Sequence, residues 1–209
     1  MKPFEFTGDQ PKVFIRKLFK LFNQWHDLLR QYEEMMSADK DLPYWHTERT
    51  NTGLLAAAAV KLCYVAIEEY SAERGTRVKK RAGRADLWIC DDEGRGYDFE
   101  VKQYWASLHT PKITGIKREL NRAKIDVSNL RYPSKNRIAL VFVIPRFLTS
   151  NKFDVDEFRE TILDTKRIGC SFSALHLCPK QIFEECRSLE DSKYYYYPGI
   201  AAIGQYVKS

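Results

Sequence analysis

Residues 83–104, GRADLWICDDEGRGYDFEVKQY, contain two short apolar segments on either side of a turn. Apolar and charged residues alternate in both segments, as in β-strands, where successive side chains point to opposite faces of a sheet. The letters DDEGRG at 91–96 are typical of a loop that joins two antiparallel strands. We therefore expect strands over 85–90 and 97–104, with one apolar face and one charged face that carries Asp86, Glu100 and Lys102.

The charged face is the first candidate for chemistry. An antiparallel register in which position numbers sum to 186 or 188 places Asp86 opposite Glu100 or Lys102, with Cβ atoms about 5 Å apart. Two carboxylates at this spacing repel each other unless a cation lies between them, and hard oxygen ligands suit Mg²⁺, or Mn²⁺ in its place. A neighbouring lysine can orient an attacking water or neutralise charge in the transition state. The alternative is a surface cluster of exposed ion pairs.

Helical periodicity marks two segments before this stretch. Between residues 13 and 36, apolar residues recur at steps of three and four, which predicts an amphipathic helix that packs on the core. Residues 37–43 are expected to form a polar connection. A second helix is expected to run from about 48 or 53 to 73 and to end at Gly75 as its cap, followed by a short strand over 76–81.

The remaining chain predicts further alternation of helices and strands. We expect a basic helix over 112–127, an apolar strand over 137–144, a helix over 154–165, a strand over 171–177, and a C-terminal strand over 194–207 interrupted at 198–199. This order indicates an α/β protein. Its 209 residues suit a single domain, in which 1–45 is an N-terminal helical extension, 46–178 the core and 179–209 a C-terminal addition.

The order of elements and the charged strands together resemble the PD-(D/E)XK, or restriction-endonuclease-like, nuclease superfamily. The resemblance rests on Asp86 in GRADLWI and on Glu100, Val101 and Lys102 in YDFEVKQ, within residues 48–178. It implies an αβββαβ core with a mixed central sheet. It also implies that Asp86, Glu100 and the Val101 carbonyl bind the metal, and that Lys102 assists catalysis. Ala85 departs from the pattern, because a proline gives the motif its name.

A third acidic residue is also implied by the resemblance, from the helix before the first strand. Glu69 follows the inward stripe of the expected second helix, and Glu48 lies near the start of that helix. Glu48 is favoured slightly, because the alanines after it allow the helix to approach the sheet closely. An acidic residue at a helix start also stabilises the helix dipole, which is its plain structural role.

Positive charge flanks the candidate site. With 34 Lys and Arg against 28 Asp and Glu, the chain has a formal net charge of +6, which suits a polyanionic partner. Basic residues gather before Asp86 and on the helix after the E-x-K strand, where they could bind phosphates or simply face solvent. The candidate nucleic-acid contacts are Lys79, Lys80, Arg81, Arg84, Lys112, Lys117, Arg118 and Arg122.

Other chemistries have less support. The five cysteines are scattered without a C-x-x-C pair, so a secreted disulfide framework is not expected and a reducing cytoplasm fits better. No apolar run is long enough to span a bilayer. Cys170, His176, Cys178 and Cys186 lack the spacing of a zinc knuckle. His26, His46 and His109 have no nucleophile motif nearby, and the tyrosines at 194–197 are expected to pack rather than stack on bases.

The sequence thus predicts a Mg²⁺-dependent endonuclease that hydrolyses phosphodiester bonds. DNA is the expected substrate, with RNA as an alternative, and restriction or phage defence is the setting that the resemblance implies. A homodimer or a partner protein is open, and no membrane partner is expected. The competing hypothesis is a catalytically inactive module that binds nucleic acid or serves assembly while it retains the fold.

Overall fold

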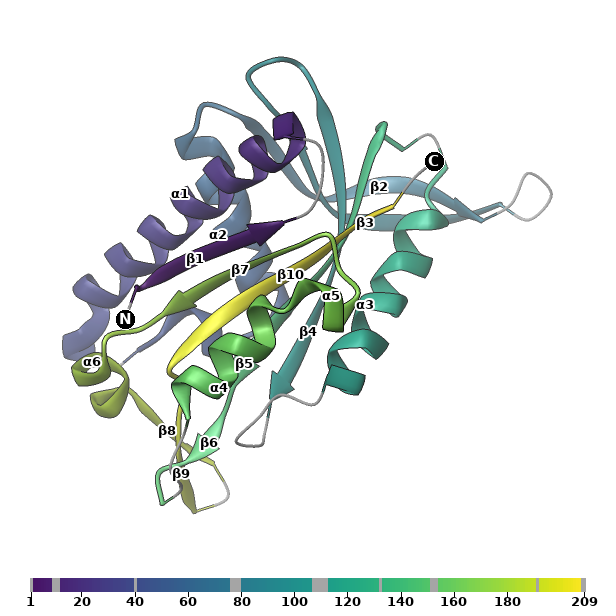
Figure 1. The fold of residues 1–209 in the computed structure, drawn as a ribbon. Coiled ribbons are helices and arrows are strands. Elements are labelled where there is room, and N and C mark those ends of the chain that lie inside the picture. Colours follow the sequence, from purple (N-terminus) through teal and green to yellow (C-terminus); the bar gives the residue numbers. More distant parts are fainter. Residues whose placement is uncertain are drawn as a thin grey trace.

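The structure, a computed structural model, describes residues 2–8, 12–39, 41–75, 80–106, 113–131, 133–150, 154–190 and 192–207. It is a mixed α/β structure with helices on both faces of a central seven-stranded sheet (Figure 1). The seven strands are β1 (Phe4–Gly8), β2 (Val65–Gly75), β3 (Lys80–Cys90), β4 (Gly96–Ala106), β5 (Asn136–Pro145), β7 (Phe172–Leu177) and β10 (Gly199–Val207). Their order is β1-β7-β10-β5-β4-β3-β2, and the sheet is mixed because β4 and β5 run parallel while β3 and β4 run antiparallel.

Each face of the sheet packs against its own set of helices. Helices α1 (Lys12–Met36) and α2 (Glu48–Lys61) cover one face, where their apolar side chains join Leu87, Phe99 and Phe142 in a buried cluster. Helices α3 (Ile113–Ser128), α4 (Val155–Leu163) and α5 (Thr165–Ile168) cover the other, around Val141 and Val143. Strand β5 is buried along nearly its whole length because both layers press on it.

The expected hairpin and its register are confirmed. Strands β3 and β4 pair antiparallel with Leu87 opposite Phe99 and Ile89 opposite Tyr97, so the position numbers sum to 186. The helices expected over 13–36, 112–127 and 154–165 correspond to α1, to α3, and to α4 followed by α5. The strands expected over 137–144 and 171–177 correspond to β5 and β7.

The prediction of one long helix over 48–73 is wrong. Helix α2 begins after Thr47, whose hydroxyl accepts a hydrogen bond from the Thr50 N–H at 3.3 Å. It ends at Lys61, and Cys63 then adopts a left-handed conformation with φ of 61°. The chain leaves the helix there and continues as β2, in which branched residues favour an extended chain. Gly75 therefore ends a strand, and most of the strand expected over 76–81 lies outside the described residues.

The C-terminal region forms two strands of different sheets rather than one interrupted strand. A small second sheet has the order β6-β9-β8, with β6 (Phe147–Leu148), β8 (Arg187–Glu190) and β9 (Lys193–Tyr196), and helix α6 (Lys180–Glu185) directly precedes β8. After Pro198, strand β10 enters the main sheet between β5 and β7. A side chain at Gly199 would place its Cβ 2.2 Å from the His176 carbonyl oxygen, so the glycine permits this close entry. Tyr197 is buried, while Tyr194 is exposed.

In both β2 and β3, the alternation of side chains between the two faces of the sheet is interrupted at one position. Their pairing runs through Glu68 and Leu87, omits Glu69 and Asp86, and resumes with Tyr70 opposite Ala85. Leu87 belongs to the core on the α1 and α2 side, whereas Ala85 belongs to the core on the α3 side. Because regular strands alternate with a period of two, this requires an irregularity between them, and Glu69 has a φ of 45° there. Asp86 thus lies at a break in the ladder.

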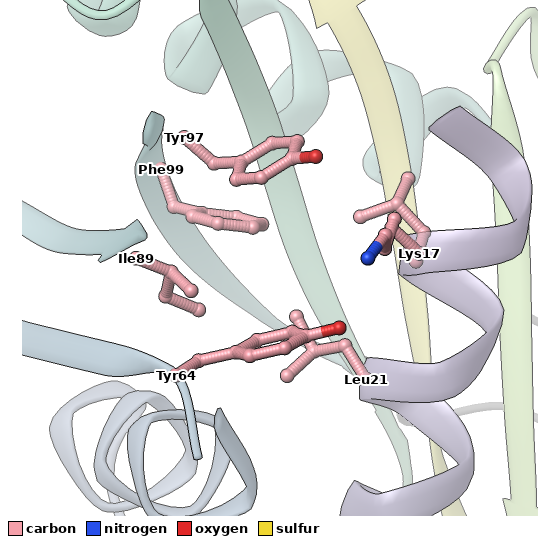
Figure 2. Close-up of a pocket in the computed structure, with 7 residues that line it drawn as sticks. Lys17, Leu21, Tyr64, Ile89, Tyr97 and Phe99 are labelled. Atoms are coloured by element: carbon pink, nitrogen blue, oxygen red, sulfur yellow. The ribbon is translucent and has the colours of Figure 1, made fainter. Parts of the chain in front are cut away.

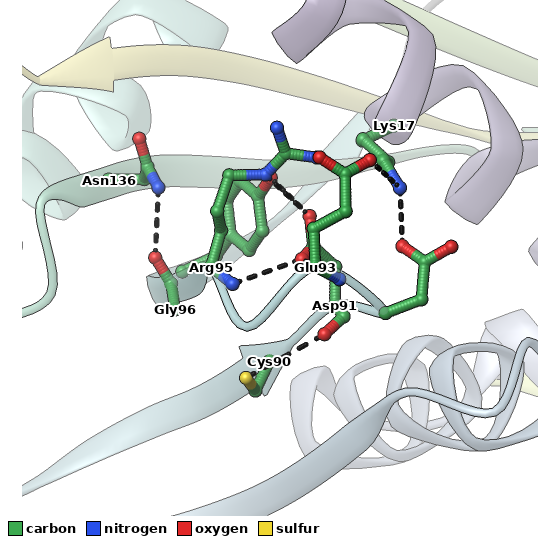
Figure 3. A network of polar contacts seen from close by, with 9 residues as sticks. Lys17, Cys90, Asp91, Glu93, Arg95, Gly96 and Asn136 are labelled. Atoms are coloured by element: carbon green, nitrogen blue, oxygen red, sulfur yellow. Dashed lines mark hydrogen bonds and ion pairs between the residues drawn. The ribbon is translucent and has the colours of Figure 1, made fainter.

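The turn between β3 and β4 is stabilised by polar contacts within the hairpin and by contacts from helix α1 (Figure 3). Asp91 accepts hydrogen bonds from the Glu93 and Arg95 N–H groups at 2.9 and 3.0 Å and from the Tyr97 hydroxyl at 3.0 Å. Lys17 of α1 forms ion pairs with Asp92 and, at 2.7 Å, with Glu93. Helix α1 is therefore fastened to the hairpin that carries the candidate site. None of the described helices is both long and apolar enough to cross a membrane.

Candidate active site

Asp86 is joined directly to the E-x-K strand. The last β3–β4 pair on this side is Leu87 with Phe99, so the ladder ends one position before Asp86 and Glu100. There the Oδ2 atom of Asp86 accepts a hydrogen bond from the Val101 N–H at 2.7 Å. The carboxylate thus takes the place of a strand carbonyl and holds the two strands where their backbones diverge.

Glu100 is a buried carboxyl group on the face of β4 that packs toward α3. It is 1% exposed, and an oxygen accepts a hydrogen bond from the guanidinium of Arg74. Burial and, next in size, the nearby Asp86 carboxylate raise the pKa of Glu100 to about 8, although Arg74 and Lys102 act in the opposite direction. A buried carboxyl group therefore lies near the half-buried carboxylate of Asp86.

Lys102 extends from the same face of β4 toward helix α3. Its Nζ atom lies 3.1 Å from Oδ2 of Asp126, and the side chain is 17% exposed. Burial alone would lower the pKa of Lys102, but the hydrogen bond to Asp126 and the charges of Asp86 and Glu48 outweigh it, so the pKa is raised. Lys102 is therefore cationic at neutral pH, as a group that stabilises developing negative charge must be.

Glu48 interacts with the charged groups of the site, whereas Glu69, although it lies opposite Asp86 in the β2–β3 register, pairs with two arginines. Burial raises the pKa of Glu48, and the Asp86 carboxylate contributes, whereas Lys102 and a hydrogen bond from the Gln103 backbone lower it. Glu48, the first residue of α2, thus interacts with Asp86 of β3 and Lys102 of β4. Glu69 lies on β2 and forms ion pairs with Arg49 at 3.2 Å and Arg84 at 2.8 Å. Its expected place on a helix is wrong because the helix ends eight positions earlier, at Lys61.

The start of α2 is fixed to the E-x-K strand by a polar pair that the sequence prediction missed. Asn51, which is fully buried, donates from Nδ2 to Oε1 of Gln103 at 3.0 Å. Gln103 in turn donates from Nε2 to the His46 carbonyl at 3.1 Å. This arrangement keeps Glu48 beside Lys102. The position of Gln103, directly after the E-x-K motif, is the signal that could have suggested its role.

Two further residues near the motif were not expected to have a role in the site. Asp126 of α3 binds Lys102 through its side chain, and its backbone carbonyl accepts a hydrogen bond from Nη1 of Arg74 at 3.2 Å. Arg74 of β2 binds Glu100. Their partners depend on tertiary packing across three elements, and their sequence positions give no signal of this.

The donor groups suit a divalent cation, although they are not arranged around one. Asp86, Glu100 and Glu48 supply carboxylate oxygens, and Val101 supplies a backbone carbonyl, which are the ligands that Mg²⁺ and Mn²⁺ prefer. The mutual repulsion of Asp86 and Glu100 is the charge pattern that a cation relieves. No group of three or more His, Cys, Asp or Glu side chains within the described ranges has the geometry of an assembled metal site.

Most of the predicted basic contacts have exposed side chains. The side chain of Arg84 is 72% exposed and pairs with Glu69. Arg118 and Arg122 are 69% and 63% exposed, and both pair with Glu119. Lys117 and Arg81 are also exposed. Lys79 and Lys112 lie outside the described residues, and Lys80 begins β3.

His26, His176 and Cys186 are buried and form polar contacts away from the candidate site. His26 and His176 approach each other at 2.7 Å between Nδ1 atoms, and Nε2 of His176 lies 2.8 Å from Glu33. Cys186 donates weakly to the Asp41 carbonyl at 3.9 Å, and the five cysteines are free thiols. The histidine contacts join α1 to β7, whereas the cysteine contact joins the residue after α6 to the segment between α1 and α2.

A small cavity beside the hairpin does not suit a ligand. It lies between α1 and the sheet, where apolar side chains and two tyrosine rings surround it (Figure 2). Its volume is about 10 Å³, which is near the minimum for a single water. The residues that line it are Lys17, Leu18, Leu21, Tyr64, Ile89, Tyr97 and Phe99. The candidate site lies instead where the pairing of β3 and β4 ends, beside α3 and the start of α2. Comparison of the chain with protein-family models, curated proteins and solved structures found no match.

Proposed function

We propose that this chain is a Mg²⁺-dependent endonuclease whose core, from α2 to β5, is of the restriction-endonuclease-like type. The order α2-β2-β3-β4-α3-β5 corresponds to the αβββαβ order of that superfamily, and it includes the parallel β4–β5 pair. The observation that carries the proposal is the buried Glu100 carboxyl beside Asp86, with Lys102 on the same strand face. DNA is the proposed substrate, since the exposed arginines near the site can contact a phosphate backbone.

Each residue has a distinct role in this proposal. Asp86, Glu100 and the Val101 carbonyl would hold Mg²⁺, which when bound polarises the phosphoryl oxygen and lowers the pKa of a water. Lys102 carries positive charge toward the phosphate and stabilises the charge that grows there. Glu48 is placed to accept a proton or to orient water, because its pKa is raised by burial. The exposed arginines orient the nucleic-acid backbone.

The test is a plasmid nicking and linearisation assay with Mg²⁺, Mn²⁺ or EDTA. We expect metal-dependent cleavage by the wild-type protein and a loss of at least about a hundredfold in Lys102→Ala, as for a group that acts mainly on the transition state. DNA binding by Lys102→Ala should persist. Lys180→Ala is the matched control, because Lys180 lies on α6 and pairs only at the surface with Glu184. Full activity in Lys102→Ala, or cleavage that EDTA does not stop, would refute the assignment.

One observation favours a second candidate, a catalytically inactive module that binds nucleic acid. Glu100 is paired with a cation of the chain itself, because Arg74 donates to its carboxylate. A protein that no longer binds metal would need such a partner to keep a buried carboxyl group paired. In that case DNA binding should be unchanged by EDTA, and no metal should support cleavage.

A further inference from the structure

Arg74 is held more completely than a surface arginine. Its Nη2 atom donates to Oε1 of Glu100, its Nε atom donates to the Arg84 carbonyl at 3.1 Å, and its Nη1 atom donates to the Asp126 carbonyl at 3.2 Å. The side chain is 12% exposed, whereas that of Glu100 is 2% exposed. All three guanidinium nitrogens therefore face acceptors that border the candidate site.

The backbone leaves room for this arginine at one particular residue. A Cβ atom added at Gly83 would lie 2.8 Å from Cδ and 3.0 Å from Nε of Arg74. Gly83 is opposite Ala72 in the β2–β3 ladder, two positions before Arg74. The absence of a side chain at Gly83 thus allows the arginine stem to cross β3 and reach β4.

The charges explain why a cation is needed there. When Glu100 is ionised, it and the half-buried Asp86 repel each other, and Lys102 is already bound to Asp126. Arg74 supplies positive charge to Glu100 when no metal is present. It donates a hydrogen bond to a carboxylate oxygen of Glu100, the residue that is expected to bind the metal. A guanidinium and a divalent cation repel each other at such a distance, so the two cannot both neutralise this carboxylate at full strength.

We propose that Arg74 is a built-in counter-cation of the resting site, which a divalent metal must displace from Glu100 in order to bind. The inference rests on the proposed metal site, and it adds that Arg74 competes with the metal for Glu100. It makes Arg74 a positioning residue, since Arg74 acts by setting the conformation and charge of Glu100. Metal affinity is then lowered by the free energy needed to break the Arg74–Glu100 pair.

The experiment measures Mn²⁺ binding without nucleic acid, by electron paramagnetic resonance and by calorimetry. Arg74→Gln should bind Mn²⁺ about tenfold or more tightly than the wild type, because both the competing charge and its hydrogen bond are gone. Gly83→Ala should tighten binding in the same direction while it keeps the arginine. Arg30→Gln is the matched control, because it removes the same charge from an exposed side chain of α1 that pairs with Glu34, and the Mn²⁺ affinity of this variant should stay within about twofold of that of the wild type.

The outcomes separate the inference from the proposed function. Unchanged or weaker binding in both Arg74→Gln and Gly83→Ala, with normal binding by the wild type, overturns the inference and leaves the metal site intact. No Mn²⁺ binding by any of these proteins overturns both. Circular dichroism checks that each variant is folded. If Arg74→Gln does not fold, Gly83→Ala decides, because tighter binding supports displacement and unchanged binding refutes it.

Discussion

Acidification should destabilise this protein through one buried histidine of α1. His26 is 7% exposed, its ring stacks on Phe4 with centroids 5.0 Å apart, and its Nδ1 atom faces Nδ1 of His176 on β7. Burial, with smaller contributions from His176 and Arg30, lowers the pKa of His26 to about 4, although Glu33 acts in the opposite direction. A proton on His26 therefore favours the unfolded chain.

The size and sign of the effect follow from this pKa. The shift from 6.5 to about 4 corresponds to about 3 kcal/mol of unfolding free energy. Because the folded-state pKa is lowered, the contribution is fully present above pH 6.5. It is lost progressively as the pH falls toward 4, where the unfolded chain binds a proton that the folded chain does not.

The assay is urea unfolding of the wild type and of His26→Gln at intervals between pH 7.5 and 4. Other groups also titrate in this range, so the difference between the two curves is the measured quantity. We expect the difference in unfolding free energy to change by up to about 3 kcal/mol over this range, with the wild type losing more as the pH falls. His46→Gln is the control, since His46 is exposed and pairs with Asp41 at 3.1 Å. Parallel pH profiles for the wild type and His26→Gln would refute the reasoning.

Two predictions concern the candidate site and its surface. Glu48→Gln should lower Mg²⁺-dependent cleavage at least about tenfold, whereas Glu69→Gln should retain activity because Glu69 pairs with surface arginines. The plasmid assay compares the two variants, and a loss of cleavage only in Glu69→Gln would contradict the assignment of Glu48 to the site. Replacing Lys117, Arg118 and Arg122 with alanine should weaken DNA binding and flatten its salt dependence by up to about one unit of slope for each phosphate contact removed. Fluorescence anisotropy at several salt concentrations measures the slope, and an unchanged slope would place the DNA path elsewhere.

The hairpin and its register could be predicted because local pattern determines them. Alternation defined both strands, and the turn at 91–96 fixed the pairing to one of two sums, of which 186 is observed. Asp86 and Glu100 were therefore placed together from the sequence. The direction in which Lys102 extends depends on α3, which is distant in sequence.

The end of α2 shows what local pattern could not supply. The apolar spacing that suggested a helix continues past Lys61, but Cys63 adopts a left-handed conformation, and nothing in its residue type signals this. Glu69 was misplaced as a result. To place the Glu69 side chain correctly, one would also need to know of the irregularity shared by β2 and β3. That irregularity is a property of the paired strands rather than of either segment.

The energetic cost of Glu100 argues that its role is not to stabilise the fold. Even with Arg74 beside it, its pKa is raised from 4.5 to about 8, so at pH 7 the group disfavours the folded state by about 3 kcal/mol relative to an ordinary glutamate. The sign is opposite to that of His26, because this cost is absent at acid pH and grows as the pH rises from 4.5 to about 8. Buried ion pairs can often be replaced by apolar residues with no loss of stability, and Val141 of β5 shows that this face accepts such residues. An acidic residue kept at this cost, beside a second acid and a lysine, is better explained by what it binds than by what it stabilises.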